Sequence, residues 1–157
     1  MPKELKGDMN GQGLQIGVVV ARFNEIITNK LLDSAIQTLE QHGGRDEDIT
    51  VGWVPGSFAL PVVSNTMATS GRYHAVICLG AVIRGETSHY DMVAGQAACG
   101  IASIGLETGV PTIFGVLTTE NMDQALNRSG GKSGNMGANT AVAAIETARM
   151  VEAANTA

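Results

Sequence analysis

Residues 80–91, GAVIRGETSHYD, bring two glycines, small hydroxyl side chains and a histidine together in one short stretch. An apolar run of strand length, YHAVICLGAVI, ends inside this stretch, and apolar residues recur at helical spacing after it. We therefore expect residues 84–88 to form the loop between a strand and a helix. Ligands collect at this kind of junction in parallel α/β sheets, so the loop is a candidate binding site.

The chemistry of this loop suits an anion. The first backbone N–H groups of a helix are unpaired and carry the positive end of its dipole. Thr87 and Ser88 add hydroxyl donors, and His89 lies where its side chain could pass a proton to or from a bound substrate. Thr and Ser are also ordinary N-caps, so the same residues fit a capped loop without function. The spacing alone leaves both interpretations open.

The composition indicates one globular domain. The chain has 157 residues, of which 44% are hydrophobic and 16% are charged, enough for a sizeable core. Ten Lys and Arg face fifteen Asp and Glu, which gives a formal charge of −5. Since no basic stripe appears, we expect no nucleic-acid partner. Twenty glycines and many alanines allow close helix contacts, which favours subunit interfaces.

The cysteines and the apolar runs bear on cellular context. Cys78 in the apolar strand and Cys99 in the following helix are expected to be buried free thiols. No run of about eighteen apolar residues occurs, so we expect no membrane span. No signal segment is apparent, and we expect a cytoplasmic location. No cluster of ligand residues has metal-binding spacing, so no metal is expected.

Strand and helix patterns alternate along the chain. Strands are expected at residues 14–21, 49–54, 75–83 and 111–118. Helices are expected at residues 25–42, 89–109 and 138–153, with a short helix opening at 120–122 and a loop at 127–137. Residues 55–61 are expected to turn into a further helix that runs to about Ser70, with Ser57 as a possible N-cap. This alternation predicts an α/β fold with a parallel sheet and helices on both faces. Residues 1–13 are predicted to be a tail or edge segment, and residues 14–157 a single domain.

Four separated stretches resemble one enzyme family. They are ARFNEIIT at 21–28, VPGSFALP at 54–61, GAVIRGETSHYDMV at 80–93 and FGVLTTENMDQALNRSGGKSGNMG at 114–137. In order and spacing they are similar to the 6,7-dimethyl-8-ribityllumazine synthases, which catalyse the penultimate step of riboflavin biosynthesis. The resemblance covers the chain from about Leu14 to the final helix.

The resemblance implies a flavodoxin-like three-layer αβα sandwich with a four-stranded parallel sheet. It implies a homo-pentamer with active sites between adjacent subunits, or twelve such pentamers in an icosahedral shell, with riboflavin synthase as a further partner. The reaction would condense 5-amino-6-(D-ribitylamino)uracil with 3,4-dihydroxy-2-butanone 4-phosphate, releasing phosphate and water. No metal or redox cofactor would take part.

The resemblance also assigns roles to matching positions. His89 would be the general acid or base, and Glu86, Thr87 and Arg128 would bind the phosphate. The residues expected to bind the uracil substrate and its ribityl chain are Phe23, Ser57, Phe58, Ala59, Ala81, Val82, Ile83 and Phe114. Phe114 and Arg128 would serve the site of the neighbouring subunit.

Two positions depart from the family pattern. Ala59 stands where the family usually has Glu, and Met136 stands where it usually has Lys. Each absent contact would be worth about 1.5–3 kcal/mol when made to an ionised group. These two departures leave one alternative open, a shell-forming scaffold that binds lumazine or flavin with little turnover. A second alternative is an archaeal-type riboflavin synthase, which shares the fold but would use two lumazine molecules as substrate.

Overall fold

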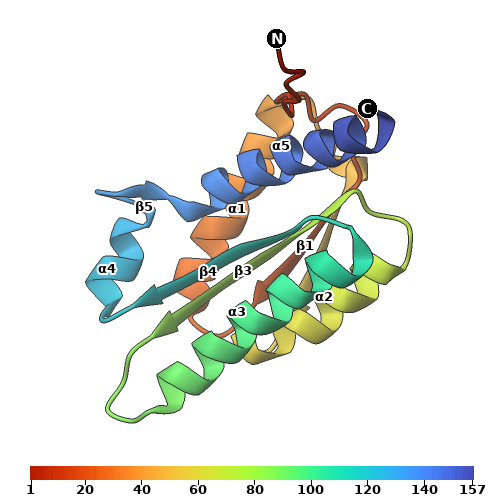
Figure 1. Ribbon diagram of the computed structural model, residues 1–157. Helices are drawn as coiled ribbons and strands as arrows, with labels where there is room; N and C mark the ends of the chain where they lie inside the picture. Colours follow the sequence, from red (N-terminus) through yellow and green to blue (C-terminus); the bar gives the residue numbers. More distant parts are fainter.

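Four parallel strands form the centre of the computed structural model, which describes residues 1–157 (Figure 1). The strands are β1 (Ile16–Ala21), β2 (Ile49–Val54), β3 (Ala75–Ile83) and β4 (Thr112–Thr119), in the order β2-β1-β3-β4 across the sheet. All three neighbouring pairs are parallel. The predicted four-stranded parallel sheet is confirmed.

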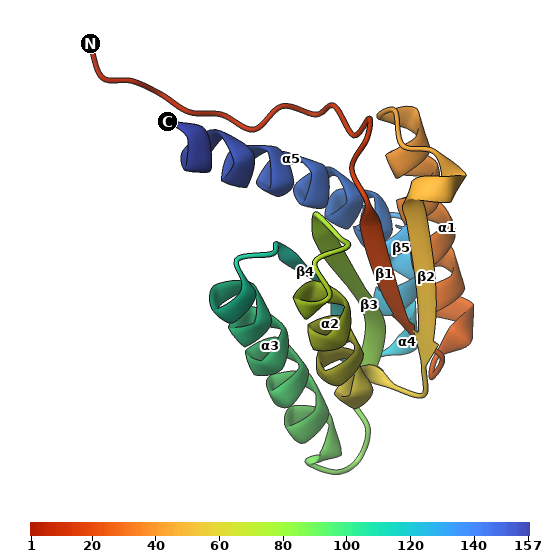
Figure 2. The same ribbon diagram turned by 90° about the vertical axis from the view of Figure 1, so that its right-hand side faces the viewer.

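Helices cover both faces of this sheet, as Figure 2 shows. One face is covered by α1 (Glu25–Gln41) and α5 (Met136–Thr156), and the other by α2 (Leu60–Thr69) and α3 (His89–Thr108). Short 3-10 turns occur at Asp46–Asp48 and Ser57–Ala59. The predicted three-layer α/β architecture is therefore confirmed.

The central strands β1 and β3 are continuous apolar runs, which made them predictable from the sequence. All six residues of β1 are buried, as are residues 75–81 of β3. Strands covered on both faces become continuous apolar runs rather than alternating ones. In α1 the buried residues Ile27, Leu31, Ala35 and Leu39 recur at helical spacing, which matches the predicted stripe.

The side chains form two separate apolar clusters, one on each face of the sheet. The α1/α5 core contains 19 buried residues, whereas the α2/α3 core contains 10. Successive residues of one strand alternate between them: Ile77 and Leu79 join the first core, and Val76 and Cys78 join the second. One strand thus anchors both helical layers.

The predicted loop at residues 127–137 is partly wrong. After the short helix α4 (Met122–Asn127), the chain forms a small antiparallel hairpin of β5 (Ser129–Gly131) and β6 (Gly134–Asn135). The turn is sterically allowed because Gly130 and Gly134 adopt positive φ angles of 114° and 84°. The Asn135 side chain then accepts a hydrogen bond from the Gly137 N–H at 2.8 Å, so α5 begins at Met136 rather than at Ala138.

Two further side-chain predictions are corrected. Cys78 is buried as expected, but Cys99 is exposed because it lies on the outer face of α3. Met92, the first apolar residue of the same helix, is also exposed. Ser57 makes no side-chain capping hydrogen bond; it begins the Ser57–Ala59 turn, where Gly56 is the N-cap. Apolar periodicity alone does not distinguish a helix face that meets the sheet from one that meets another surface.

Residues 1–13 contain no helix or strand and pass along α5 (Figure 2). Arg149 holds this N-terminal segment, because its Nε and Nη2 atoms donate to the carbonyl oxygens of Asn10 and Gln12, each at 2.8 Å. No helix in the structure combines the length and apolar character needed to cross a bilayer.

Candidate functional site

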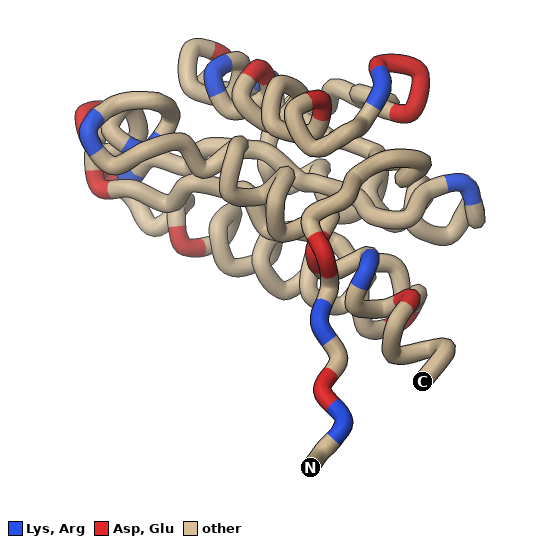
Figure 3. Tube along the Cα trace, turned by 90° about the horizontal axis from the view of Figure 1, so that it is seen from above, with Lys and Arg blue, Asp and Glu red and all other residues tan.

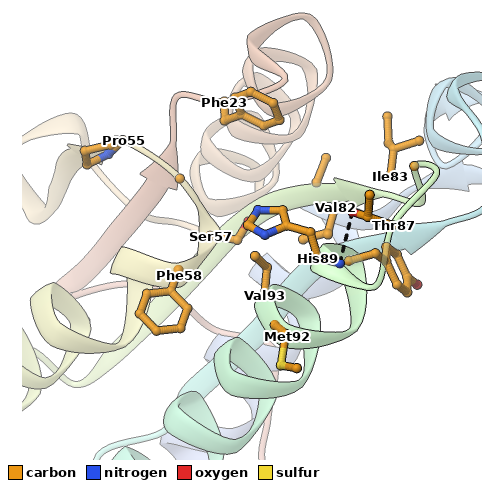
Figure 4. A pocket seen from close by; sticks show the side chains of 14 residues that line it. Phe23, Pro55, Ser57, Phe58, Val82, Ile83, Thr87, His89, Met92 and Val93 are labelled. Carbon is orange, nitrogen blue, oxygen red and sulfur yellow. Dashed lines mark hydrogen bonds between the residues drawn. The ribbon is translucent and has the colours of Figure 1, made fainter.

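A cavity of about 750 Å³ opens where the carboxyl ends of the central strands meet α3 (Figure 4). Its walls come from the segments after β1 and β2, the end of β3, the following loop and the first turns of α3. The lining residues are Phe23, Pro55, Gly56, Ser57, Phe58, Ala81, Val82, Ile83, Gly85, Thr87, His89, Tyr90, Met92 and Val93. Eight of these fourteen are hydrophobic, which suits a flat organic ring more than a hydrated ion.

Backbone pairing continues past the strand ends and positions the first aromatic side chain. The Arg22 N–H donates to the Val54 carbonyl at 2.7 Å, and the Phe23 N–H donates to the Pro55 carbonyl at 3.0 Å. Asn24 then adopts the left-handed conformation, with φ at 63°, and its Nδ2 donates to the Ala81 carbonyl at 2.8 Å. This contact ties the segment after β1 to the end of β3, so Phe23 is held over the cavity.

Phe23 and Phe58 are exposed, although both line the cavity. Their exposed fractions are 70% and 65%. An aromatic ring at a strand end could have packed into the core, and the sequence did not distinguish the two outcomes. The structure leaves both rings available for stacking on a ligand.

Ser57 lies against β3 at a position that requires glycine. A Cβ atom added to Gly80 would come within 2.5 Å of the Ser57 Oγ. The close approach buries Ser57 and brings its turn to the cavity wall. Ala59 does not line the cavity, because it packs against the α2/α3 core.

His89 is the first residue of α3 and is exposed at the cavity wall. In Figure 4 its ring extends from the helix toward the side of the cavity that Ser57 and Phe58 form. The ring makes no hydrogen bond to another residue of the chain, while the His89 backbone N–H bonds to the Thr87 Oγ1 at 3.3 Å. Both ring nitrogens are therefore available to a ligand.

The loop before α3 is only partly directed at the cavity. Gly85 and Thr87 line it, whereas Glu86 is exposed and does not. The positive end of the α3 dipole lies at the same end of the cavity, where an anion would be stabilised. Thr87 and the helix terminus are thus at the cavity, whereas the Glu86 side chain lies outside its lining.

Two predicted site residues, Phe114 and Arg128, lie away from the cavity of the single chain, as does Met136, which departs from the family pattern. Phe114 lies in β4 opposite Cys78 and is 40% exposed. Arg128 follows α4, where its Nη1 donates to the Gln124 carbonyl at 3.3 Å. Met136 packs against the α1/α5 core. One chain therefore does not bring Phe114 and Arg128 to its own cavity.

Several lining residues were not identified from the sequence. Tyr90, Met92 and Val93 reach the cavity from the first turns of α3, and Pro55 and Gly56 from the turn after β2. Their adjacency to His89 and Ser57 was the available signal. A helix that starts at a cavity presents its first turns to it, whatever the polarity of those residues.

Other reactive groups do not form a second centre. No group of three or more His, Cys, Asp or Glu side chains could hold a metal ion. Burial raises the pKa of the Cys78 thiol to about 12, although a hydrogen bond with Ser64 partly opposes this. Cys78 therefore stays protonated at neutral pH and is a poor nucleophile.

Comparison with known proteins gives concordant matches. The family model for 6,7-dimethyl-8-ribityllumazine synthase matches residues 13–152. A chloroplastic 6,7-dimethyl-8-ribityllumazine synthase of Arabidopsis thaliana is 57% identical over 144 residues, which cover 92% of this chain. The matched region spans 63% of the length of that relative.

Proposed function

Because the chain belongs to the 6,7-dimethyl-8-ribityllumazine synthase family, we propose that it is a transferase of riboflavin biosynthesis. It would condense 5-amino-6-(D-ribitylamino)uracil with 3,4-dihydroxy-2-butanone 4-phosphate to 6,7-dimethyl-8-ribityllumazine, releasing phosphate and water. The observation that carries this proposal is the cavity itself. It combines exposed aromatic rings, an unpaired histidine ring and a helix N-terminus in one space.

The cavity supports binding of both substrates side by side. Its volume of about 750 Å³ falls within the common range of small-molecule sites. Phe23 would stack on the pyrimidine ring, and Ala81, Val82 and Ile83 would flank it with apolar surface. Thr87 and the N–H groups at the start of α3 would hold the phosphate at the other end.

His89 would serve the proton transfers of the reaction. The uracil amine attacks the carbonyl carbon of the second substrate, and loss of water forms an imine. Elimination then removes a carbon-bound proton, breaks a carbon–oxygen bond and releases phosphate, which leaves an enol that tautomerises to a ketone. The ribityl-bearing nitrogen attacks this carbonyl carbon, and loss of a second water closes the ring. Each step moves a proton, and the His89 ring, free of other hydrogen bonds, could donate or accept it within the cavity.

The surface of α3 supports an assembly of identical chains. Along this helix, exposed small or apolar residues recur at alternating spacings of three and four, namely Met92, Gly95, Cys99, Ala102 and Leu106. This heptad spacing is typical of a helix that packs against another helix. α2 carries no charged residue, and Lys and Arg elsewhere are scattered over the chain (Figure 3).

The proposed assembly is a pentamer in which Phe114 and Arg128 of one chain complete the cavity of the next. This arrangement would supply the arginine that the cavity of one chain lacks, and a guanidinium can bind two phosphate oxygens at once. Twelve such pentamers would form an icosahedral shell. Sedimentation separates five chains of 16.3 kDa from a single chain and from a shell.

Steady-state formation of lumazine from the two substrates, followed by its absorbance, tests the proposed reaction. The wild type is compared with an Ala59→Glu, Met136→Lys double variant. Turnover by the wild type is expected, and its absence would overturn the proposal. Absent turnover that the double variant restores would indicate a binding scaffold. Riboflavin formed from lumazine alone would instead identify a riboflavin synthase.

A further inference from the structure

Arg84 lies between the end of β3 and the loop that leads to His89, and its side chain is used elsewhere than in the cavity. Its backbone N–H donates to the Thr119 carbonyl at 2.8 Å, which extends the pairing of β3 with β4. Its Nε lies 2.9 Å from the Glu120 carboxylate, just past the end of β4. The residue is therefore fixed to the edge strand at both its backbone and its side chain.

The same guanidinium also reaches the first turn of α3. Its Nη1 lies 3.6 Å from the Asp91 carboxylate, and its Cζ lies 4.2 Å from the centre of the Tyr90 ring. Tyr90 lines the cavity and follows His89 directly. One side chain thus joins the residue before the loop, the end of β4 and the two residues after His89.

The loop between these points has little other support. Residues 85–88 are exposed, and the hydrogen bonds within this stretch are local, such as Thr87 Oγ1 with the His89 N–H. The His89 ring has no hydrogen-bond partner in the chain, so nothing fixes it directly. Its position depends on where the first turn of α3 is held.

We infer that Arg84 is a positioning residue for His89: by joining Glu120 to Tyr90 and Asp91, it fixes the loop and the first turn of α3 at the cavity. Both carboxylates and the guanidinium are partly exposed, with exposed side-chain fractions of 39% to 62%. Exposed ion pairs add little to global stability. A small displacement of a catalytic group is far more costly for rate, about 100-fold for 1 Å.

The hydrogen bond to Glu120 raises the pKa of the Arg84 guanidinium, so this residue stays charged throughout any practical pH range. A change in the pH profile of a variant would therefore not arise from the titration of Arg84 itself. This separates an effect on the catalytic group from a loss of fold.

The kinetic test rests on the proposed function. Arg84→Gln is expected to lower kcat about 10- to 100-fold and to shift the pH profile, with an unchanged KM for the uracil substrate. Glu120→Gln should lower kcat in the same way, and the double variant should be no worse than Arg84→Gln. Arg84→Lys should recover part of the loss, since lysine keeps the positive charge but lacks the planar guanidinium that reaches both carboxylates. Arg72→Gln is the matched control. The Arg72 Cζ lies 5.8 Å from the centre of the Tyr73 ring, but Arg72 makes no ion pair.

Two kinetic outcomes would overturn the inference. One is an unchanged kcat in Arg84→Gln. The other is a raised KM for the phosphate substrate alone that Glu120→Gln does not reproduce, because Arg84 would then bind phosphate directly.

Hydrogen–deuterium exchange of the peptide covering residues 85–92 provides a test that does not depend on turnover. We expect faster exchange in Arg84→Gln than in the wild type or Arg72→Gln, with equal exchange in the β1 peptide. Equal exchange in all three proteins would reject the inference. If the wild type formed no lumazine, the proposed function would fail, and this exchange experiment would still decide the role of Arg84.

Discussion

The two helical layers are completed to different extents within one chain. Between the sheet and the α1/α5 layer lie 19 buried residues, and this layer is closed by direct packing of α1 on α5. The α2/α3 layer buries 10 and leaves apolar side chains such as Val62 and Leu106 exposed on its outer surface. The first layer contains the larger core, whereas the second carries the cavity and an exposed apolar outer surface.

The difference between the layers also separates stability from chemistry. The α1/α5 core contains the long fully buried side chains of α1. The cavity side contains exposed lining residues, among them Phe23, Phe58 and His89. Substitutions in the first region should change the free energy of unfolding, and those in the second should change turnover.

The largest effect is expected at His89. His89→Ala should lower kcat about 100- to 10,000-fold, because general acid–base help of this size would be lost. The free energy of unfolding should not change, since the ring makes no hydrogen bond in the chain. Steady-state turnover and urea denaturation measure the two quantities. Unchanged turnover would remove the assigned role of His89.

Leu31→Ala should have the opposite profile. Leu31 is fully buried in α1, so the truncation should lower the free energy of unfolding by about 2–5 kcal/mol. Val62 in α2 is 67% exposed, and Val62→Ala should change the free energy of unfolding by less than about 0.5 kcal/mol. Urea denaturation of both variants at one protein concentration compares them. Similar losses would contradict the contrast between the layers.

Gly80→Ala tests the contact between β3 and Ser57, where folding and the cavity wall depend on the same close approach. The added methyl would collide with the Ser57 Oγ, so we expect a loss of about 1–3 kcal/mol together with weaker uracil binding. Gly52→Ala in β2 is the matched control, because nothing lies within 4 Å of its added Cβ. If both variants unfolded at the same urea concentration, the close approach of Ser57 would not be required.

The smallest effect is expected from alkylation of the two cysteines, which compares a buried thiol of the α2/α3 core with an exposed thiol on α3. At pH 8 a thiol-alkylating reagent should modify exposed Cys99 and leave Cys78 intact, since burial raises the Cys78 pKa to about 12. Mass spectrometry of the labelled peptides gives the ratio of modified Cys99 to modified Cys78. Assembly through α3 should slow the labelling of Cys99, whereas dilution to single chains should restore it. Equal labelling of both thiols would show that the inner surface is open.

The sequence was most informative where one local rule applied. The buried strands β1 and β3 were predictable because continuous apolar runs are typical of strands covered on both faces. The loop before His89 was predictable because a strand pattern changes to a helix pattern there. Residues 55–58 and His89 then fall at the same edge of the sheet as a consequence of parallel pairing.

Other features depended on information that local patterns do not contain. The β5–β6 hairpin has strands of three and two residues, too short for a periodic signal. Cys99 and Met92 belong to an apolar helix pattern but are exposed, and Met92 lines the cavity. The spacing alone does not say which surface such a residue faces. The contact of Arg84 with Glu120 required knowing that β3 and β4 end side by side.

Both chain termini lie at the end of the sheet opposite the cavity, with the N-terminal segment running beside the last turns of α5 (Figures 1 and 2). Arg149 holds that segment in place through two backbone carbonyls. For protein engineering, a tag or a domain fused at either end would lie at the end of the sheet opposite the cavity.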